Sequence, residues 1–98
     1  MAEIRWTAEA AAWLEDIYSY IAQDDPDAAG RVVNAIYDKV QILAEFPEIG
    51  QRYRSEPEGD IRILLYGHYR IANLLRGRDV VEVLGVFHSA LDIERYLL

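Results

Sequence analysis

The side chains of this sequence that could act on a phosphate or a carboxylate are its arginines and two histidines. Arg62 and Arg70 fall in the strand-like segments IRILLY and YRIANLLR, and His88 ends the apolar run VLGVFH. An imidazole at the end of a strand could act as a general base or acid, and a guanidinium suits bidentate contacts to phosphate or carboxylate. The structural interpretation competes with this one. The two arginines would pair with Glu82 or other acids on an exposed sheet face. His88 would simply end its strand, and for this residue we favour the structural interpretation.

The charge of the chain is concentrated in its first half. The 98 residues carry 10 Lys and Arg against 17 Asp and Glu, a formal net charge of −7. Residues 1–51 hold ten of the acids and three of the bases, whereas residues 52–98 hold seven of each. General binding to DNA or RNA draws on many phosphate contacts from Lys and Arg. We therefore expect no direct nucleic-acid binding, although the arginines of the second half could form a local cationic face.

The composition also limits cofactors and location. With no cysteine and only His68 and His88, the chain cannot form a disulfide and would need carboxylates to complete a zinc site. We expect no metal and no other cofactor. The longest apolar runs, AAAWL and ILLY, are far shorter than the roughly 20 residues of a membrane span, and the start lacks a secretory signal pattern. These features favour a soluble cytoplasmic protein with no membrane partner.

The first half of the sequence has the pattern of a strand followed by two helices. Residues 2–6 alternate apolar and charged side chains, which predicts a short strand. Thr7 stands where a helix N-cap belongs, and residues 8–23 place apolar side chains at i, i+3, i+4 and i+7. The Asp-Pro step at 25–26 stops this helix and starts a second one, which we expect to run to about Glu45. The short connection predicts an antiparallel helical hairpin.

The second half of the sequence changes its apolar period from 3.6 to 2. Three strands, joined by two tight turns that contain glycine, are predicted at residues 61–66, 69–76 and 80–88. The polar residues 51–60 are predicted as a loop, and a short helix is predicted to close the chain after His88. Together with the first strand, this three-stranded antiparallel meander gives a four-stranded sheet covered by the helical hairpin. We therefore predict an α+β fold in a single domain spanning residues 1–98.

Five stretches, taken in order, also carry a family resemblance. They are WTAEAAAWLEDIYSYIA, DPDAAGRVVNAI, LAEFPEIGQRYR, IRILLYGHYRIANLL and VLGVFHSALDIERYLL. In this order and spacing they resemble the ParE/RelE superfamily of bacterial toxins, and the resemblance covers nearly the whole chain. It implies a toxin of a type II toxin-antitoxin module, encoded beside a small ParD-like antitoxin whose flexible segment wraps the toxin and silences it.

The superfamily divides by target. Members resembling RelE cut messenger RNA in the ribosome, whereas those resembling ParE inhibit DNA gyrase by binding. In this resemblance Arg62 stands where nuclease members keep a phosphate-binding arginine, and His88 where some end their sheet with a His-Tyr pair. Here Ser89 follows the histidine, and the preceding loop offers only Arg52 and Arg54, which cannot act as bases near neutral pH. The incomplete nuclease set favours the non-enzymatic ParE branch, with gyrase as the target and no catalytic residue.

Two alternatives stay open. The chain could be a RelE-type messenger RNA endoribonuclease using Arg62 and His88, or a non-toxic binding module, because Leu91 stands where many members carry an arginine. In the ParE interpretation, the expected target-binding residues are Arg62, Arg70, His88 and Arg95. The expected antitoxin-binding residues are Trp13, Tyr20 and Tyr37. Because the helical hairpin is acidic, we expect basic residues in the antitoxin segment that crosses it.

Overall fold

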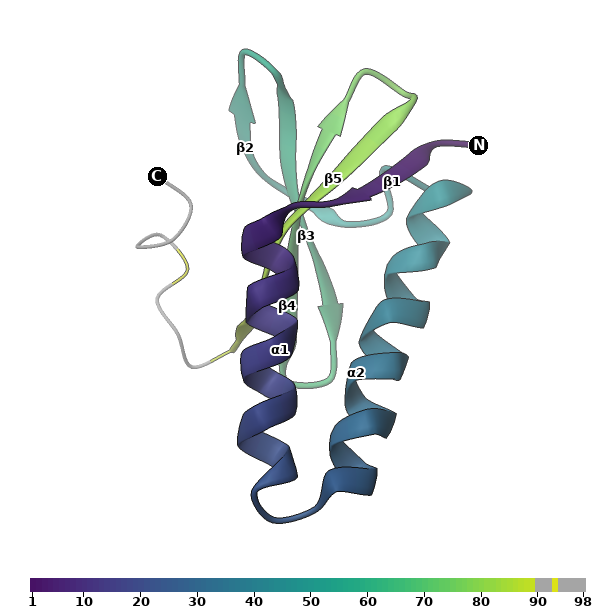
Figure 1. The fold of residues 1–98 in the computed structure, drawn as a ribbon. Helices are drawn as coiled ribbons and strands as arrows, with labels where there is room; N and C mark the ends of the chain where they lie inside the picture. Colours follow the sequence, from purple (N-terminus) through teal and green to yellow (C-terminus); the bar gives the residue numbers. More distant parts are fainter. Residues whose placement is uncertain (90–92, 94–98) are drawn as a thin grey trace.

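The computed structural model describes residues 1–89 and Ile93, and it arranges them as a helical hairpin packed on one face of a five-stranded sheet (Figure 1). The predicted α+β class is confirmed. The helices are α1 (Ala8–Ala22), α2 (Pro26–Gln41) and a turn of 3-10 helix, η1 (Ile42–Ala44). The strands are β1 (Glu3–Trp6), β2 (Gln51–Glu56), β3 (Gly59–Tyr66), β4 (Tyr69–Arg76) and β5 (Val80–His88).

The first helix begins at the cap that the sequence predicts, and the second begins at the predicted Asp-Pro step. The Thr7 side chain accepts a hydrogen bond from the backbone N of Ala10 at 3.1 Å, and Asp25 accepts one from Ala28 at 3.1 Å. Pro26 occupies the first turn of α2, where its missing N–H costs nothing. The regular α-helix ends at Gln41, and η1 continues it almost to the predicted end. Among the described residues, no helix is long and apolar enough to cross a membrane.

The sheet has the order β1-β5-β4-β3-β2 (Figure 1). The strands β3, β4 and β5 form the predicted antiparallel meander. Its two hairpins turn at Gly67 and Gly77, whose φ angles of 56° and 59° favour glycine. The first strand, β1, joins the sheet by pairing in parallel with β5. Along the chain, α1 and α2 come after β1 and before the antiparallel strands, and they pack on one face of the sheet.

The prediction of four strands was wrong, because residues 51–56 form the edge strand β2 instead of a loop. This strand is hard to recognise because it pairs on one side only, and four of its six residues are Gln51, Arg52, Arg54 and Glu56. A register shift between Arg52 and Arg54 breaks the alternation further. Charged side chains on a sheet edge also discourage unwanted pairing with other chains. The predicted C-terminal helix lies outside the described residues.

Both faces of the sheet carry apolar side chains. The larger cluster lies between the sheet and the helices, and its fully buried members are Ile36, Val40 and Leu43 from the helical half and Ile71, Val81, Val83 and Val86 from the sheet. The outer face carries a smaller buried cluster of Ile61, Ala72, Leu74, Phe87 and Ile93. Pairing shifts at Leu84, since Ala72 faces Gly85 while Asn73 faces Val83. This bulge lets Val83 and Val86 both face the helices while Phe87 turns to the outer face.

Candidate functional site

A groove runs along α1 where the helix passes the end of the sheet that holds His88. Its volume is about 630 Å³. The helix contributes side chains at i, i+3, i+4, i+7 and i+8, and two sheet strands contribute the rest. The lining residues, named here the α1 groove, are Trp13, Asp16, Ile17, Tyr20, Ile21, Tyr69, Val86 and His88. A helix that shows one apolar stripe to its core and a second to a groove presents a surface suited to a partner segment.

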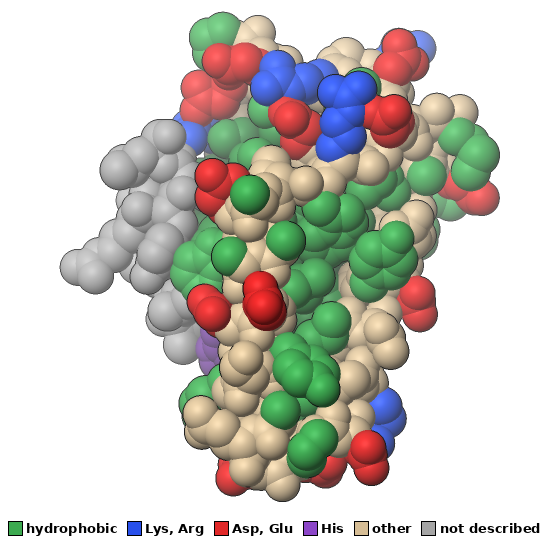
Figure 2. Space-filling model, in the orientation of Figure 1, with side chains coloured by type: hydrophobic (Ala, Val, Ile, Leu, Met, Phe, Trp, Pro, Cys, Tyr) green, Lys and Arg blue, Asp and Glu red, His purple; other side chains and the backbone are tan. Residues whose placement is uncertain are grey.

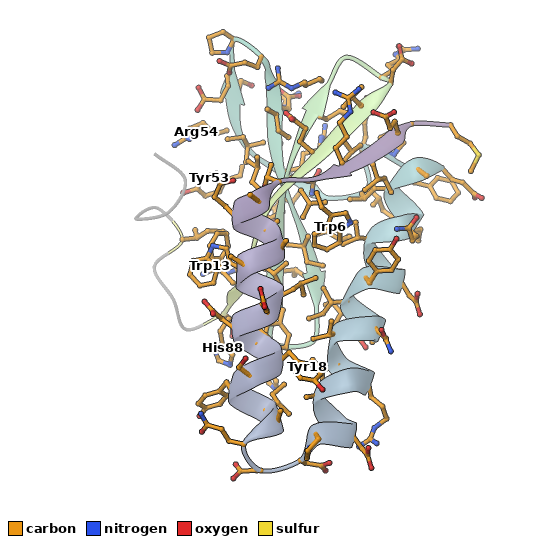
Figure 3. All side chains as sticks on the ribbon, in the orientation of Figure 1. Trp6, Trp13, Tyr18, Tyr53, Arg54 and His88 are labelled. Atoms are coloured by element: carbon orange, nitrogen blue, oxygen red, sulfur yellow. The ribbon has the colours of Figure 1, made fainter. Side chains whose placement is uncertain are left out.

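Aromatic side chains dominate the exposed part of the α1 groove. Tyr20 is 75% exposed although it is a large hydrophobic side chain. Trp13 lies on the same side of α1 as His88 (Figure 3). Its ring packs against Phe87 in a T-shaped arrangement, with ring centroids 4.8 Å apart and an interplanar angle of 71°. Aromatic residues with an apolar body are the usual anchors of protein interfaces. The groove therefore brings together Trp13 and Tyr20, the two α1 residues that the sequence assigns to antitoxin binding.

His88 lies in this groove among rings. Its imidazole stacks on His68, with centroids 6.1 Å apart, and stands edge-on to Tyr69 at 5.9 Å. The backbone N of Ser89 donates to the carbonyl oxygen of His68 at 2.7 Å, which closes the strand end. These contacts place His88 beside two rings at an exposed end of the sheet. Within residues 1–89 and Ile93, no group of three or more His, Asp and Glu side chains could hold a metal ion.

The helix that forms one wall of the α1 groove is acidic. Between Ala8 and Ala22 it carries Glu9, Glu15 and Asp16 but no Lys or Arg. Figure 2 shows acidic side chains along the exposed side of this helix, beside apolar surface between the two helices. Asp16 lies in the groove itself. A segment with apolar anchors and a cationic side chain would complement both the shape and the charge of this groove.

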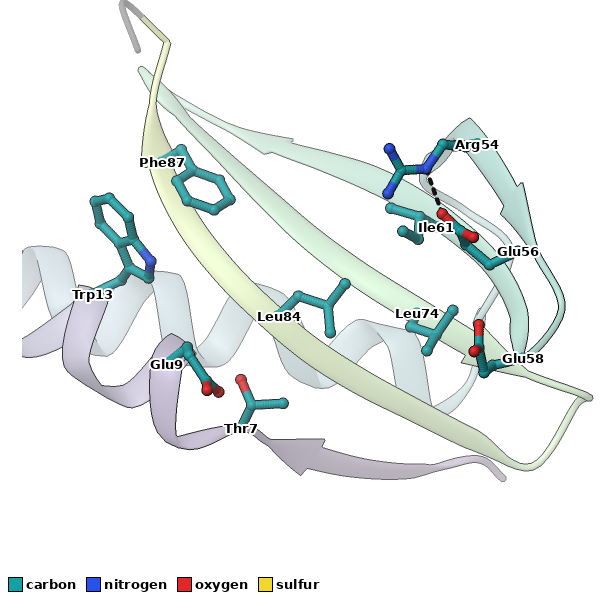
Figure 4. A pocket seen from close by; sticks show the side chains of 10 residues that line it. All are labelled: Thr7, Glu9, Trp13, Arg54, Glu56, Glu58, Ile61, Leu74, Leu84 and Phe87. Carbon is teal, nitrogen blue, oxygen red and sulfur yellow. Dashed lines mark ion pairs between the residues drawn. The ribbon is translucent and has the colours of Figure 1, made fainter. Parts of the chain in front are cut away.

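A second cavity, of about 700 Å³, adjoins the groove at Trp13 (Figure 4). Its apolar floor comes from the outer face of the sheet, and its rim carries three glutamates and an arginine. The lining residues are Thr7, Glu9, Trp13, Arg54, Glu56, Glu58, Ile61, Leu74, Leu84 and Phe87. Arg54 is ion-paired with Glu56 across 2.5 Å. The rim therefore carries more acidic than basic side chains, so the negative charge of α1 extends past Trp13 to this cavity.

The guanidinium of Arg62 contacts the backbone of the segment that precedes β2. Its Nη1 atom donates hydrogen bonds to the carbonyl oxygens of Glu48, at 3.0 Å, and Gly50, at 2.7 Å. The arginine thus holds the connection between η1 and β2 against the sheet. Its cross-strand neighbour on β4 is Asn73, four residues from Tyr69, the neighbour of His88. With about 3.3 Å per residue and about 4.8 Å between strands, the α-carbons of Arg62 and His88 lie roughly 16 Å apart.

The remaining predicted residues are spread over the molecule. Arg70 lies on the outer face of the sheet, with Leu65 and Phe87 as cross-strand neighbours. Glu82 pairs with Arg76 and not with Arg62 or Arg70. Arg95 lies outside the described residues. Tyr37 stands on α2, where its ring stacks on Trp6 at 5.8 Å, away from the α1 groove. The three predicted target-binding residues that the structure describes, Arg62, Arg70 and His88, therefore do not form one site.

Sequence reasoning missed part of the α1 groove. Asp16, Ile17 and Ile21 line it, yet the apolar spacing of residues 8–23 was used only to predict the helix. A helix wheel drawn from Trp13 would have found them, since Asp16, Ile17, Tyr20 and Ile21 follow it at helical spacing. Tyr69 and Val86 could not be found this way, because their place beside α1 depends on how the sheet packs.

Comparisons with known proteins agree with one another. Residues 4–93 match the family model described as ParE toxin of type II toxin-antitoxin system, parDE. A protein of Sinorhizobium fredii, described as "Putative toxin Y4kP", is 44% identical over 91 residues that cover 88% of this chain and 86% of the relative. A solved structure titled as the chromosomal ParDE TA system from P. aeruginosa superposes with a TM-score of 0.71 at 24% identity. It covers 90% of this chain and 96% of its own, and at that identity it shows a shared fold.

Proposed function

This chain belongs to the ParE toxin family of type II toxin-antitoxin systems, and from that premise we propose that it is a cytoplasmic, non-enzymatic toxin that inhibits DNA gyrase by binding. The match of residues 4–93 to the ParE model is the observation that carries this proposal. In the same proposal the whole chain acts as one toxin domain, and a ParD-like antitoxin silences it.

The geometry around His88 supports binding over catalysis. A ribonuclease must bring a base, a cation for the phosphate and an acid to one phosphodiester. Here Arg62 donates to the Glu48 and Gly50 carbonyl oxygens, and His88 stands exposed beside His68 and Tyr69. Their α-carbons are roughly 16 Å apart, from the strand spacing. A gyrase inhibitor that acts by binding needs no such constellation.

We propose that the antitoxin binds in the α1 groove. Tyr20 and Trp13 would give apolar anchoring, and Asp16 would bind a Lys or Arg of the antitoxin segment. Tyr37, on the other helix, would extend the contact across the hairpin. Because exposed ion pairs are screened by salt, the affinity of the complex should fall as ionic strength rises. His88 would contact the antitoxin or the target as a groove residue and not as a catalyst.

Expression of the chain under tight control, without the gene product of its neighbour, tests this function. We expect growth arrest, inhibited supercoiling by purified gyrase and intact messenger RNA, with growth restored when the neighbouring product is co-expressed. Message cut in translating ribosomes, with gyrase unaffected, would replace the proposal with the RelE-type ribonuclease. Unimpaired growth at full expression would instead leave the non-toxic binding module.

A further inference from the structure

The connection between η1 and β2, residues 46–50, presents two large apolar side chains to solvent. Phe46 is 55% exposed and Ile49 is 51% exposed. Together with Pro47, Glu48 and Arg78 they line a hollow of about 500 Å³. Arg78 comes from the turn between β4 and β5, so the hollow joins two segments distant in sequence. We name residues 46–50 with Arg78 the Phe46 surface.

The backbone of residues 46–50 is held in place from several sides. The backbone N of Phe46 donates to Ile42 at 2.9 Å, and that of Ile49 donates to Phe46 at 3.1 Å. Arg62 binds the carbonyl oxygens of Glu48 and Gly50 from the neighbouring strand. Gly50 lies so close to β3 that a Cβ there would be 3.0 Å from the carbonyl oxygen of Ile63.

A loop held in this way exposes Phe46 and Ile49 in a fixed geometry. Exposed apolar side chains lose little conformational freedom on binding when their backbone is already ordered. Aromatic and arginine side chains are also the commonest energetic anchors of protein interfaces. The composition and the order of the Phe46 surface therefore suit an interface.

The position of the Phe46 surface separates it from the α1 groove. Arg78 follows Arg76 at one end of β4, whereas Tyr69, a groove residue, lies at the other end. Seven steps of about 3.3 Å put these two strand ends roughly 23 Å apart. A segment bound in the α1 groove would leave the Phe46 surface open, so the two surfaces suit two different partners.

The charges of the Phe46 surface indicate what kind of partner it fits. Arg78 and Glu48 both line the hollow, and Asp79 follows Arg78 in the chain. Arg78 forms no ion pair with any residue in the described part of the chain. A protein surface with an apolar depression beside a carboxylate, which would pair with Arg78, fits both the shape and the charge.

We propose that the Phe46 surface is where this toxin contacts its protein target, with Phe46 and Ile49 as apolar anchors and Arg78 paired to a target carboxylate. The inference rests on the proposed function, because it assigns the surface to the target of a toxin. In this arrangement Arg62 is a positioning residue: it orders the loop through the Glu48 and Gly50 carbonyls without touching the target.

The test compares toxicity with antitoxin binding in the same variants. Growth arrest on induction reports contact with the target without requiring its identity, and calorimetry with the purified product of the neighbouring gene reports antitoxin binding. The variants are Phe46→Ala with Ile49→Ala, and separately Arg78→Ala. The matched control is Leu65→Ala, which removes a 64% exposed apolar side chain from β3, outside the surface.

We expect the Phe46 and Ile49 variant to raise survival on induction at least about tenfold, and Arg78→Ala to raise it several-fold. Antitoxin affinity should stay within about twofold of the wild type, and the control should change neither measurement. Unfolding temperature, measured for each variant, separates a lost contact from a lost fold. Because Phe46 and Ile49 are half exposed, the double variant should still fold. If it does not, the toxicity of Arg78→Ala tests the surface independently.

Three outcomes would overturn the inference. If the folded variants are as toxic as the wild type, the Phe46 surface does not contact the target. An equal loss of antitoxin affinity would assign the surface to the antitoxin, and a wild-type dimer that these variants convert to monomers would assign it to a second copy of the chain. Failure of the wild type to arrest growth has a different meaning, because it would overturn the proposed function together with this inference.

Discussion

The ring of Phe87 lies over Gly85, two residues earlier in β5, so that a Cβ on Gly85 would come within 2.4 Å of the Phe87 Cζ atom. The glycine lets the ring lie close to its own strand, where it packs against Trp13 in a T-shaped arrangement. Trp13 in turn lines both the α1 groove and the neighbouring cavity (Figure 4). The absence of one side chain in β5 thus positions an anchor of the candidate site.

Gly85→Ala should destabilise the protein, because the added methyl group must displace a fully buried ring. Overpacking of this kind costs about 1–3 kcal/mol in the free energy of unfolding, measurable by urea denaturation. Gly30→Ala is the matched control, since its Cβ would meet nothing within 4 Å and the residue lies inside α2. That control should stabilise the protein by about 0.5–1 kcal/mol. Equal effects at the two glycines would contradict the packing described for Phe87.

Arg62→Ala should destabilise the loop that carries Phe46. The substitution removes two hydrogen bonds to main-chain carbonyls, and hydrogen bonds from a charged donor contribute about 1.5–3 kcal/mol each at most. We expect the loss of about 2 kcal/mol in unfolding free energy and faster hydrogen exchange at residues 46–50. Arg52→Ala, which removes only an exposed ion pair to Asp60 at 3.5 Å, should cost less than about 1 kcal/mol. Comparable effects of the two substitutions would mean that the Arg62 hydrogen bonds do not hold the loop.

Thr7→Ala should lower stability through two contacts at once. The Thr7 hydroxyl accepts from the backbone N of Ala10 at 3.1 Å and donates to the carbonyl oxygen of Val83 at 2.8 Å, so it joins the start of α1 to β5. Loss of an N-cap typically costs about 1 kcal/mol, and the second bond should raise the total to about 2 kcal/mol. Thr7→Ser keeps the hydroxyl and should retain most of the stability. If serine unfolds as easily as alanine, the hydroxyl is not the cause.

These contacts also separate what the sequence could predict from what it could not. The cap at Thr7, the helix start at the Asp-Pro step, the helical hairpin and the three-stranded meander follow from local patterns, and each is confirmed. The strand β2 was missed, because an edge strand with mostly polar residues lacks the apolar alternation that predicts strands. The predicted α+β class was still correct, because the added strand only extends the sheet at one edge.

The roles of individual side chains were harder to predict than the fold. Arg62 was expected at a target or a phosphate, but its guanidinium is turned to carbonyls of a loop that precedes it in the chain. No local pattern reveals such a contact, because it depends on where the loop folds back. Trp13 and Tyr20 share the α1 groove, whereas Tyr37 stacks on Trp6, a separation that only the helix packing determines.

Asp16→Asn should weaken antitoxin binding and reduce its salt dependence. The carboxylate lies in the α1 groove on a helix without Lys or Arg, so a basic antitoxin side chain would pair with it. An exposed ion pair contributes up to about 1 kcal/mol, a factor of about five in affinity. Calorimetric titrations at low and high salt would measure both effects. Asp38→Asn, an exposed position of α2 outside the groove, should leave the salt dependence unchanged, and an identical shift would mean that only the net charge of the toxin matters.

The central claim is that the antitoxin is bound in the α1 groove, and the affinity of the Tyr20→Ala variant for the purified product of the neighbouring gene tests it most directly. Tyr20 is 75% exposed, so its removal should leave the fold intact, and calorimetry should show the dissociation constant rising at least about tenfold. The Leu65→Ala control, on the sheet, should bind like the wild type. Unchanged affinity of Tyr20→Ala beside a tightly binding wild type would contradict the claim and place the antitoxin elsewhere.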